Sequence, residues 1–281
     1  MPFDRLFPQP KMGPVAEAYA EEILARSRVV AETTRAALDI PYGSDACQRL
    51  DLYFPDDSNA GSLPVLIFLH GGGWEYGYKE WMGFMAPSFT DLPAIFVSVG
   101  YRLLPAHRFP AQLDDTITAL AWVHANIARF GGSPEKLFIG GHSAGGHLSA
   151  LATLSRDLVG RAGLPAGVIR ACFPVSAVCE FKPGELEARG KHLLARPEDA
   201  TEASPITHVA DNKVPFYIVW GDADLEYVMR TCPPMVDALR QAGSRVEYAV
   251  FAGENHFQPN LDGGNRDSEW VQTVRRWMQE A

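Results

Sequence analysis

The feature that most constrains the fold of this chain is a series of short, continuous apolar runs. Within each run the apolar residues follow one another instead of alternating with polar residues, as expected for strands of a parallel sheet covered on both faces. The six runs are VLIFL (65–69), AIFVSV (94–99), KLFIG (136–140), IRACFPV (169–175), PFYIVW (215–220) and VEYAVF (246–251). An earlier stretch, QRLDLYF (48–54), does alternate and is typical of a half-buried strand.

Helical patterns separate several of these runs. After the second run, apolar residues recur at three- and four-residue steps until Gly131 and Gly132 end the pattern. Similar patterns extend from about 228 to 242 and over 270–278, and the absence of Gly and Pro from 15 to 38 predicts an N-terminal helix. Strands that alternate with helices predict an α/β fold with a mostly parallel central sheet, flanked by helices and connected by right-handed crossovers.

The domain organisation follows from the length and from one irregular segment. The chain has 281 residues and no internal repeat, so we interpret residues 1–281 as a single domain, with 1–40 as an N-terminal helical segment. Residues 181–213 are charged and proline-containing and interrupt the alternation of strands and helices. We expect this segment to be an insertion that forms a small cap together with the N-terminal helix.

Charge and composition exclude several classes of function. The net charge of −9 comes without a basic run, which argues against nucleic-acid binding. No apolar stretch reaches the ~18 residues of a membrane span, and the N-terminus lacks the apolar core of a signal peptide, so we expect a cytoplasmic protein that does not associate with membranes. The four cysteines lack the spacing of a metal site or a disulfide scaffold. The oligomeric state stays open, a homodimer included.

The strongest candidate for chemistry is Ser143, in the stretch GHSAG (141–145). An apolar run precedes this stretch and a helix is expected to begin near Ala144, which is the strand–turn–helix context of a nucleophile elbow. The flanking glycines leave room for a sharp turn that exposes the hydroxyl. The alternative is a tight turn in which the serine only caps the helix.

The stretch HGGGW (70–74) supports the catalytic interpretation. Its glycines follow the first apolar run, and N–H groups of a glycine loop can face a ligand without side chains between them, as an oxyanion hole requires. We expect the N–H groups of Gly72, Gly73 and Ala144 to form this hole. Trp74 and Tyr76 are predicted to bind the substrate in a compact aromatic site, the alternative being that such rings only pack the core.

A serine nucleophile needs a general base and an acid that orients it. His256 follows the last apolar run and precedes the C-terminal helix, which is the position of the base in the chain order Ser, acid, His. His142, within the glycine motif, is instead expected to hold a loop by hydrogen bonding. For the acid, Asp222 and Asp224 both follow an apolar run, and the residues alone do not decide between them.

Together the motifs HGGGW, GHSAGGH, GDAD and ENHF resemble the α/β-hydrolase superfamily over almost the whole chain, specifically its hormone-sensitive-lipase-like esterases. The stretch YRLLPAHRFPAQLDD (101–115) adds to this resemblance. That branch usually has Asp before the nucleophile, whereas this chain has His142. In this respect GHSAGGHLSAL is more similar to kynurenine formamidase (arylformamidase).

The resemblance implies an α/β-hydrolase fold and, by matching positions, Ser143, Asp224 and His256 as the catalytic residues. It implies a serine hydrolase that cleaves a small carboxylic ester or an aryl amide or formamide through an acyl-enzyme, without a cofactor or a metal. A short-chain carboxylesterase and a dedicated kynurenine formamidase both stay open. A non-catalytic binding protein of the same fold is the alternative of another class, and the complete set of site residues argues against it.

Overall fold

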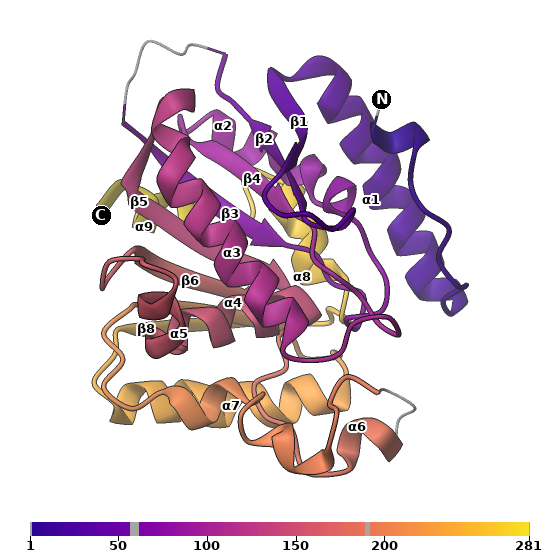
Figure 1. Cartoon of the computed structure of the whole chain (residues 1–281), viewed down its shortest axis with the longest axis vertical. Coiled ribbons are helices and arrows are strands. Elements are labelled where there is room, and N and C mark those ends of the chain that lie inside the picture. The colour runs from indigo at the N-terminus through magenta and orange to yellow at the C-terminus, as the bar shows by residue number, and fades with distance from the viewer. Residues whose placement is uncertain (1, 57–61, 189–191, 281) are drawn as a thin grey trace.

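The computed structural model describes residues 2–56, 62–188 and 192–280 and contains one eight-stranded sheet (Figure 1). The strand order is β1-β2-β4-β3-β5-β6-β7-β8. Strand β2 is antiparallel to both of its neighbours, β1 and β4, and the strands β3 to β8 are parallel to one another. The bounds are β1 Ala36–Pro41, β2 Arg49–Tyr53, β3 Leu63–Leu69, β4 Ile95–Val99, β5 Gly132–His142, β6 Ile169–Val175, β7 Phe216–Gly221 and β8 Val246–Phe251. All six continuous apolar runs form the parallel strands, which confirms the predicted α/β sheet.

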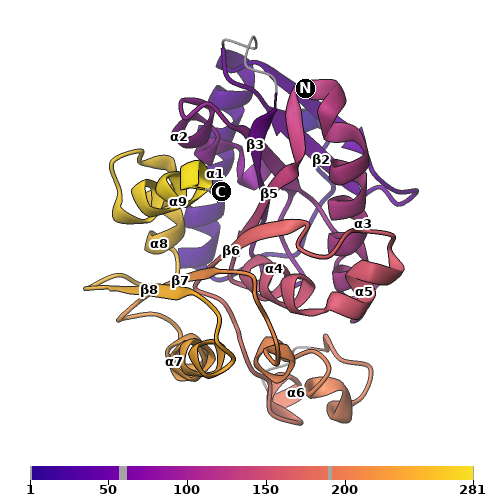
Figure 2. The same ribbon diagram turned by 90° about the vertical axis from the view of Figure 1, so that its left-hand side faces the viewer.

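Helices cover both faces of the sheet, as Figure 2 shows with α3 and α5 on one side and α8 and α9 on the other. The α-helices are α1 Pro14–Thr33, α2 Pro87–Thr90, α3 Ala111–Asn126, α4 Ala144–Leu154, α5 Arg156–Arg161, α6 Glu185–Ala188, α7 Glu226–Gln241, α8 Gln258–Leu261 and α9 Glu269–Glu280. The 3₁₀ helices are η1 Pro2–Asp4, η2 Lys79–Trp81, η3 Gly83–Met85, η4 Ile127–Phe130, η5 Pro197–Ala200, η6 Pro205–His208 and η7 Asp262–Gly264. None of the helices in these described ranges is both long and apolar enough to cross a membrane.

Successive residues of the central strands point into two separate hydrophobic clusters. In β3, Val65 and Ile67 belong to the cluster that includes side chains of α3, α4 and α7, whereas Leu66 and Phe68 belong to the cluster that includes side chains of α1 and α9. Because both faces are covered, every position of such a strand has to be apolar, which explains the continuous runs. The edge strand β8 is the exception, with Tyr248 exposed.

The N-terminal segment corrects one prediction. The helix expected over 15–38 ends at Thr33, and Ala36–Pro41 form β1, so residues 1–40 are not helical throughout. The absence of Gly and Pro from 15 to 38 gave no sign that the helix ends at Thr33. The pairing of β1 with β2, which starts at Ala36 and Tyr53, supplies the extended conformation from outside the segment.

The segment 181–213 lies between β6 and β7 and contains only α6, η5 and η6 among its described residues, 189–191 lying outside them. It is tied to the body of the protein near α3 and α5. The N–H of Phe109 donates to the carbonyl of Leu193, and Arg156 donates to the carbonyls of Ala210 and Asp211. In Figures 1 and 2 the segment lies beside α7 at the lower end of the molecule.

Candidate active site

Ser143 occupies the turn between β5 and α4, at the carboxyl end of a central strand. Its φ of 54° and ψ of −114° lie in a region that L-residues rarely adopt, so the turn stores backbone strain. A Cβ on Gly145 would lie 2.2 Å from the carbonyl oxygen of Leu69, and a Cβ on Gly141 would lie 2.4 Å from the backbone of Gly145. The glycines of GHSAG are therefore required because α4 approaches β3 and β5 so closely.

The structure brings Ser143, His256 and Asp224 together at this turn. Nε2 of His256 lies 2.8 Å from Oγ of Ser143, and Nδ1 of His256 lies 2.6 Å from Oδ1 of Asp224. All three residues are buried. A carboxylate only accepts hydrogen bonds, so we assign the imidazole proton to Nδ1, which leaves the lone pair of Nε2 to accept the serine hydroxyl. This arrangement can remove a proton from the hydroxyl.

The two candidate acids have different surroundings. Asp222 is exposed, and its Oδ1 accepts the N–H of Gly253 at 2.7 Å. Asp224 is buried and also accepts the Ser176 hydroxyl and the N–H of Leu225, both at 2.6 Å. Burial acts to raise the pKa of Asp224, but the hydrogen bonds from His256, Ser176 and Leu225 outweigh it and lower the pKa below its ordinary value. The carboxyl beside His256 is therefore ionised at neutral pH.

Ser176 is a site residue that the sequence analysis missed. It directly follows β6, the neighbour of β5, and has a φ of 49°. Its hydroxyl donates to the carboxylate oxygen of Asp224 that does not contact His256. The available signal was a polar residue just past the carboxyl end of a parallel strand, where site residues of open α/β sheets collect.

The glycine loop after β3 lies directly against the serine turn. A Cβ on Gly71 would lie 3.3 Å from Cβ of Ser143. Gly72 has a φ of 115°, and a Cβ on it would lie 2.2 Å from the carbonyl oxygen of Tyr76. Among the described residues, none accepts a hydrogen bond from the N–H of Gly72, Gly73 or Ala144. These three donors are thus available to a ligand at the serine.

Trp74 and Tyr76 have separate positions. Trp74 is buried, donates through Nε1 to Nδ1 of His147 at 3.2 Å and packs edge-on against Phe181. It also lines a cavity of about 260 Å³ beside the site, whereas Tyr76 packs against the hydrophobic cluster on the other face of the sheet. The residues around this cavity are Gly73, Trp74, Val178, Glu180, Phe181, Glu185, Leu186, Leu225 and Tyr227.

Two further histidines hold the loops around the serine. His70 donates through Nδ1 to the carbonyl of Gly71 and stacks on Tyr101 with ring centres 4.3 Å apart. His147 donates through Nε2 to the carbonyl of Ala203 at 2.7 Å. Burial lowers the pKa of both imidazoles to about 4, so both are neutral at physiological pH. No cluster of three His, Cys, Asp or Glu residues in the described chain could hold a metal ion.

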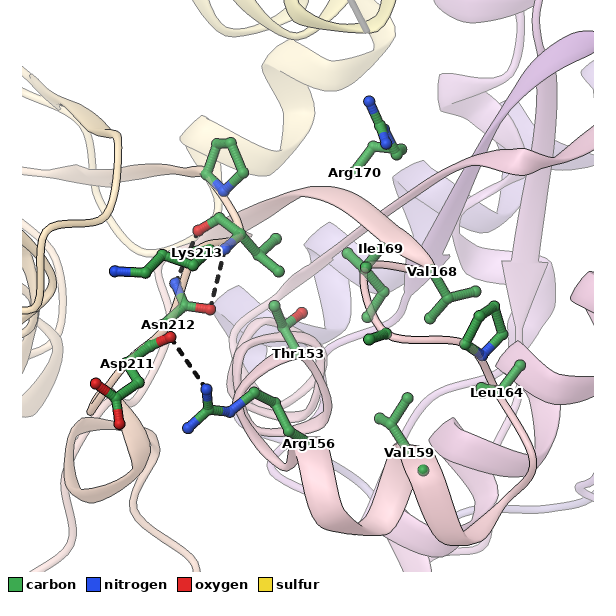
Figure 3. Close-up of a pocket in the computed structure, with 16 residues that line it drawn as sticks. Thr153, Arg156, Val159, Leu164, Val168, Ile169, Arg170, Asp211, Asn212 and Lys213 are labelled. Carbon is green, nitrogen blue, oxygen red and sulfur yellow. Dashed lines mark hydrogen bonds between the residues drawn. The ribbon is translucent and has the colours of Figure 1, made fainter.

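A second, larger cavity of about 560 Å³ lies at the amino ends of β6 and β7, whereas Ser143 lies at the carboxyl end of β5 (Figure 3). Its cations do not converge on a ligand position: Arg156 donates to backbone carbonyls, and Arg170 and Lys213 point in different directions in Figure 3. The cavity contains none of the residues that surround Ser143.

Comparison with known proteins shows that the chain is similar to esterases. The family model described as BD-FAE matches residues 50–183. Esterase LipC of Mycobacterium tuberculosis is 34% identical over 240 residues, which cover 79% of this chain and 60% of that protein. The isoprenylcysteine alpha-carbonyl methylesterase ICME of Arabidopsis thaliana is 27% identical over 249 residues, with coverages of 80% and 58%. The chain thus spans about 60% of the length of these curated relatives.

Solved structures agree with the fold. A hyperthermophilic esterase from the archaeon Pyrobaculum calidifontis has a TM-score of 0.77 and 25% identity, over 95% of this chain and 92% of that chain. The carboxylesterase EstE1, cloned from a metagenomic library, has a TM-score of 0.73 and 24% identity over 94% of this chain and 97% of that one.

Proposed function

The chain belongs to the hormone-sensitive-lipase-like esterases of the α/β-hydrolase superfamily, and from this premise we propose that it is a serine carboxylesterase acting on small esters. The observation that most supports the proposal is the hydrogen-bonded series Ser143–His256–Asp224 beside the free N–H groups of the glycine loop. The order of these hydrogen bonds is the one that acyl transfer by a serine, a histidine and a carboxylate requires.

In the proposed reaction the Oγ of Ser143 attacks the ester carbonyl while Nε2 of His256 takes the hydroxyl proton. The N–H groups of Gly72, Gly73 and Ala144 stabilise the oxyanion of the tetrahedral intermediate. His256 then returns the proton to the leaving alcohol, and the acyl group stays on Ser143. Water, deprotonated by His256, releases the carboxylic acid in a second addition and elimination. Asp224 stabilises the imidazolium in both halves.

The cavity beside the site supports a substrate with an apolar group. It adjoins the proposed oxyanion hole at Gly73 and the acid loop at Leu225, and most of its walls are apolar. Glu180 and Glu185 both face Arg230, with N–O distances of 3.7 and 2.5 Å. Glu180 and Glu185 form the polar part of the cavity wall, and the remaining walls suit an apolar acyl or alcohol group.

An arylformamidase is the second candidate, favoured by His142 at the position before the nucleophile. It shares the machinery of the esterase and differs in the leaving group, an aryl amine, and in the small formyl group. We place the ester first because the relatives and solved structures to which the chain is similar are named as esterases.

The test is kcat/KM for p-nitrophenyl acetate, butyrate and octanoate beside N-formylkynurenine. Ser143→Ala should lower turnover by about 10³-fold or more while the protein stays folded. Ser149→Ala is the matched control, because Ser149 is buried on α4, the helix that follows the serine turn, and its hydroxyl donates to the carbonyl of Gly146. Preferred cleavage of the formamide would reverse the order of the two candidates. A folded Ser143→Ala protein with full activity would refute the nucleophile.

A further inference from the structure

His142 makes a hydrogen bond that links the serine turn to the histidine loop. Its Nε2 lies 2.8 Å from the main-chain oxygen of His256, 114 residues away in the chain. A carbonyl oxygen only accepts, so Nε2 carries the proton and donates it. His142 is buried, with 1% of its surface exposed, and directly precedes Ser143. The residue before the nucleophile therefore contacts the backbone of the base.

The other side of the His142 ring faces the N-terminal helix. With the proton on Nε2, Nδ1 has a lone pair, and the hydroxyl of Tyr19 on α1 lies 3.5 Å from it. Nδ2 of Asn260 on α8 donates to the same hydroxyl at 2.7 Å. The hydroxyl proton of Tyr19 is thus left to point toward His142. Burial lowers the pKa of His142 to about 3, so the ring stays neutral and keeps this pattern of donors and acceptors.

Ring contacts hold the same loop from two sides. Tyr19 stacks on Phe257 with ring centres 4.5 Å apart, and the rings of His142 and His256 have centres 4.9 Å apart. The peptide between His256 and Phe257 is therefore bracketed by side chains of β5 and α1.

We propose that His142 is a positioning residue that holds His256 in register with Ser143, and that Tyr19 couples helix α1 to this contact. The inference rests on the proposed function, in which His256 is the base. Because His142 and Ser143 are adjacent, one turn sets the positions of both the nucleophile and the loop of the base. An aspartate at 142, the residue usual in this branch, could not donate to the carbonyl of His256 in its ionised form. This chain thus supports its base through a contact that the usual residue cannot make.

The experiment compares His142→Leu, which removes the donor, with His142→Gln, whose amide nitrogen can still reach the carbonyl. kcat is measured per active site, titrated with a serine-directed fluorophosphonate, so that a smaller folded fraction does not count as a loss. We expect His142→Leu to lower kcat by about 10- to 100-fold, because a catalytic group such as His256 that is misplaced by about 1 Å loses about this much rate. KM should change less than about threefold. Gln should restore most of the rate.

A milder variant covers the case in which His142→Leu does not fold. Tyr19→Phe removes one oxygen and should lower kcat several-fold. Tyr42→Phe is its control, since the buried Tyr42 hydroxyl donates to the carbonyl of Gly100, outside this contact. If Tyr19→Phe and a folded His142→Leu both keep the wild-type kcat per active site, the proposal is wrong and the contact serves stability alone.

A second readout does not depend on turnover. In proton NMR spectra of histidine-labelled protein, the proton that His256 shares with Asp224 should give a far-downfield signal. This signal should shift or disappear in His142→Leu and persist in His142→Gln. An unchanged signal in the Leu variant would overturn the positioning role. If the wild-type protein cleaves no ester, the proposed function fails, while this signal still decides whether His142 positions His256.

Discussion

Oδ1 of Asp224 lies 2.6 Å from Nδ1 of His256, whereas Asp222, two residues earlier, is bonded to the N–H of Gly253 and is exposed. We expect Asp224→Asn to lower kcat by roughly 10³- to 10⁴-fold, because an amide neither stabilises the imidazolium nor selects the correct tautomer. Asp222→Asn should change kcat less than about threefold. Esterase kinetics of the two purified variants check this, and equal losses would contradict the assignment of the acid.

The Ser176 hydroxyl should contribute to the ionised state of Asp224. Ser176→Ala removes one of the hydrogen bonds that lower the pKa of this carboxyl, while burial continues to act in the opposite direction. The carboxyl pKa should rise toward its ordinary value, and the carboxylate should hold the imidazolium less well. Near neutral pH we expect kcat to fall about tenfold, the equivalent of one charged hydrogen bond. The check is kcat of the wild type and the variant near neutral pH, and equal values would exclude this role.

Gly145 should tolerate no side chain. The Cβ of Gly145→Ala would lie 2.2 Å from the carbonyl oxygen of Leu69, so the serine turn must move away from the glycine loop. We expect a loss of unfolding free energy of about 1–3 kcal/mol and a large loss of kcat. Gly160→Ala in α5 is the control, since nothing lies within 4 Å of its Cβ position, and it should be neutral or stabilising by up to about 1 kcal/mol. Urea unfolding and esterase assays of both proteins measure these effects.

Acid should destabilise the protein through its buried neutral histidines. The pKa of His147 is about 4 in the folded state and about 6.5 when unfolded. The unfolded state therefore binds the proton first, so the stability contributed by His147 is complete above pH 6.5 and is lost as the pH falls toward 4. His147→Gln keeps a donor for the carbonyl of Ala203 but does not titrate. Between pH 7.5 and 4.5 the wild type should lose on the order of 2 kcal/mol more than this variant in urea unfolding. Parallel losses would show that His147 is not the group responsible.

The central sheet could be predicted because its signal is local. A strand that is buried on both faces has to be mostly apolar, and the runs that form β3 to β7 meet this condition, whereas the run that forms the edge strand β8 is partly exposed. Strand β1 lacks such a signal, since its extended conformation comes from pairing with β2. The glycines of the serine turn were also recognisable, because the close approach of α4 to β3 excludes every larger residue.

The sequence by itself determined which residue types were available at the ends of the strands: a serine in a glycine turn, two carboxylates, a late histidine and a glycine loop. Only the tertiary structure decided which of them meet. In the structure Asp224, and not Asp222, contacts His256, and Ser176 donates to Asp224. The indole of Trp74 donates to His147, and His142 donates to the backbone of His256. The physical reason is that these hydrogen bonds join residues 32 to 114 positions apart and depend on distances of about 3 Å. No local pattern encodes such distances, which result from the packing of all the intervening elements.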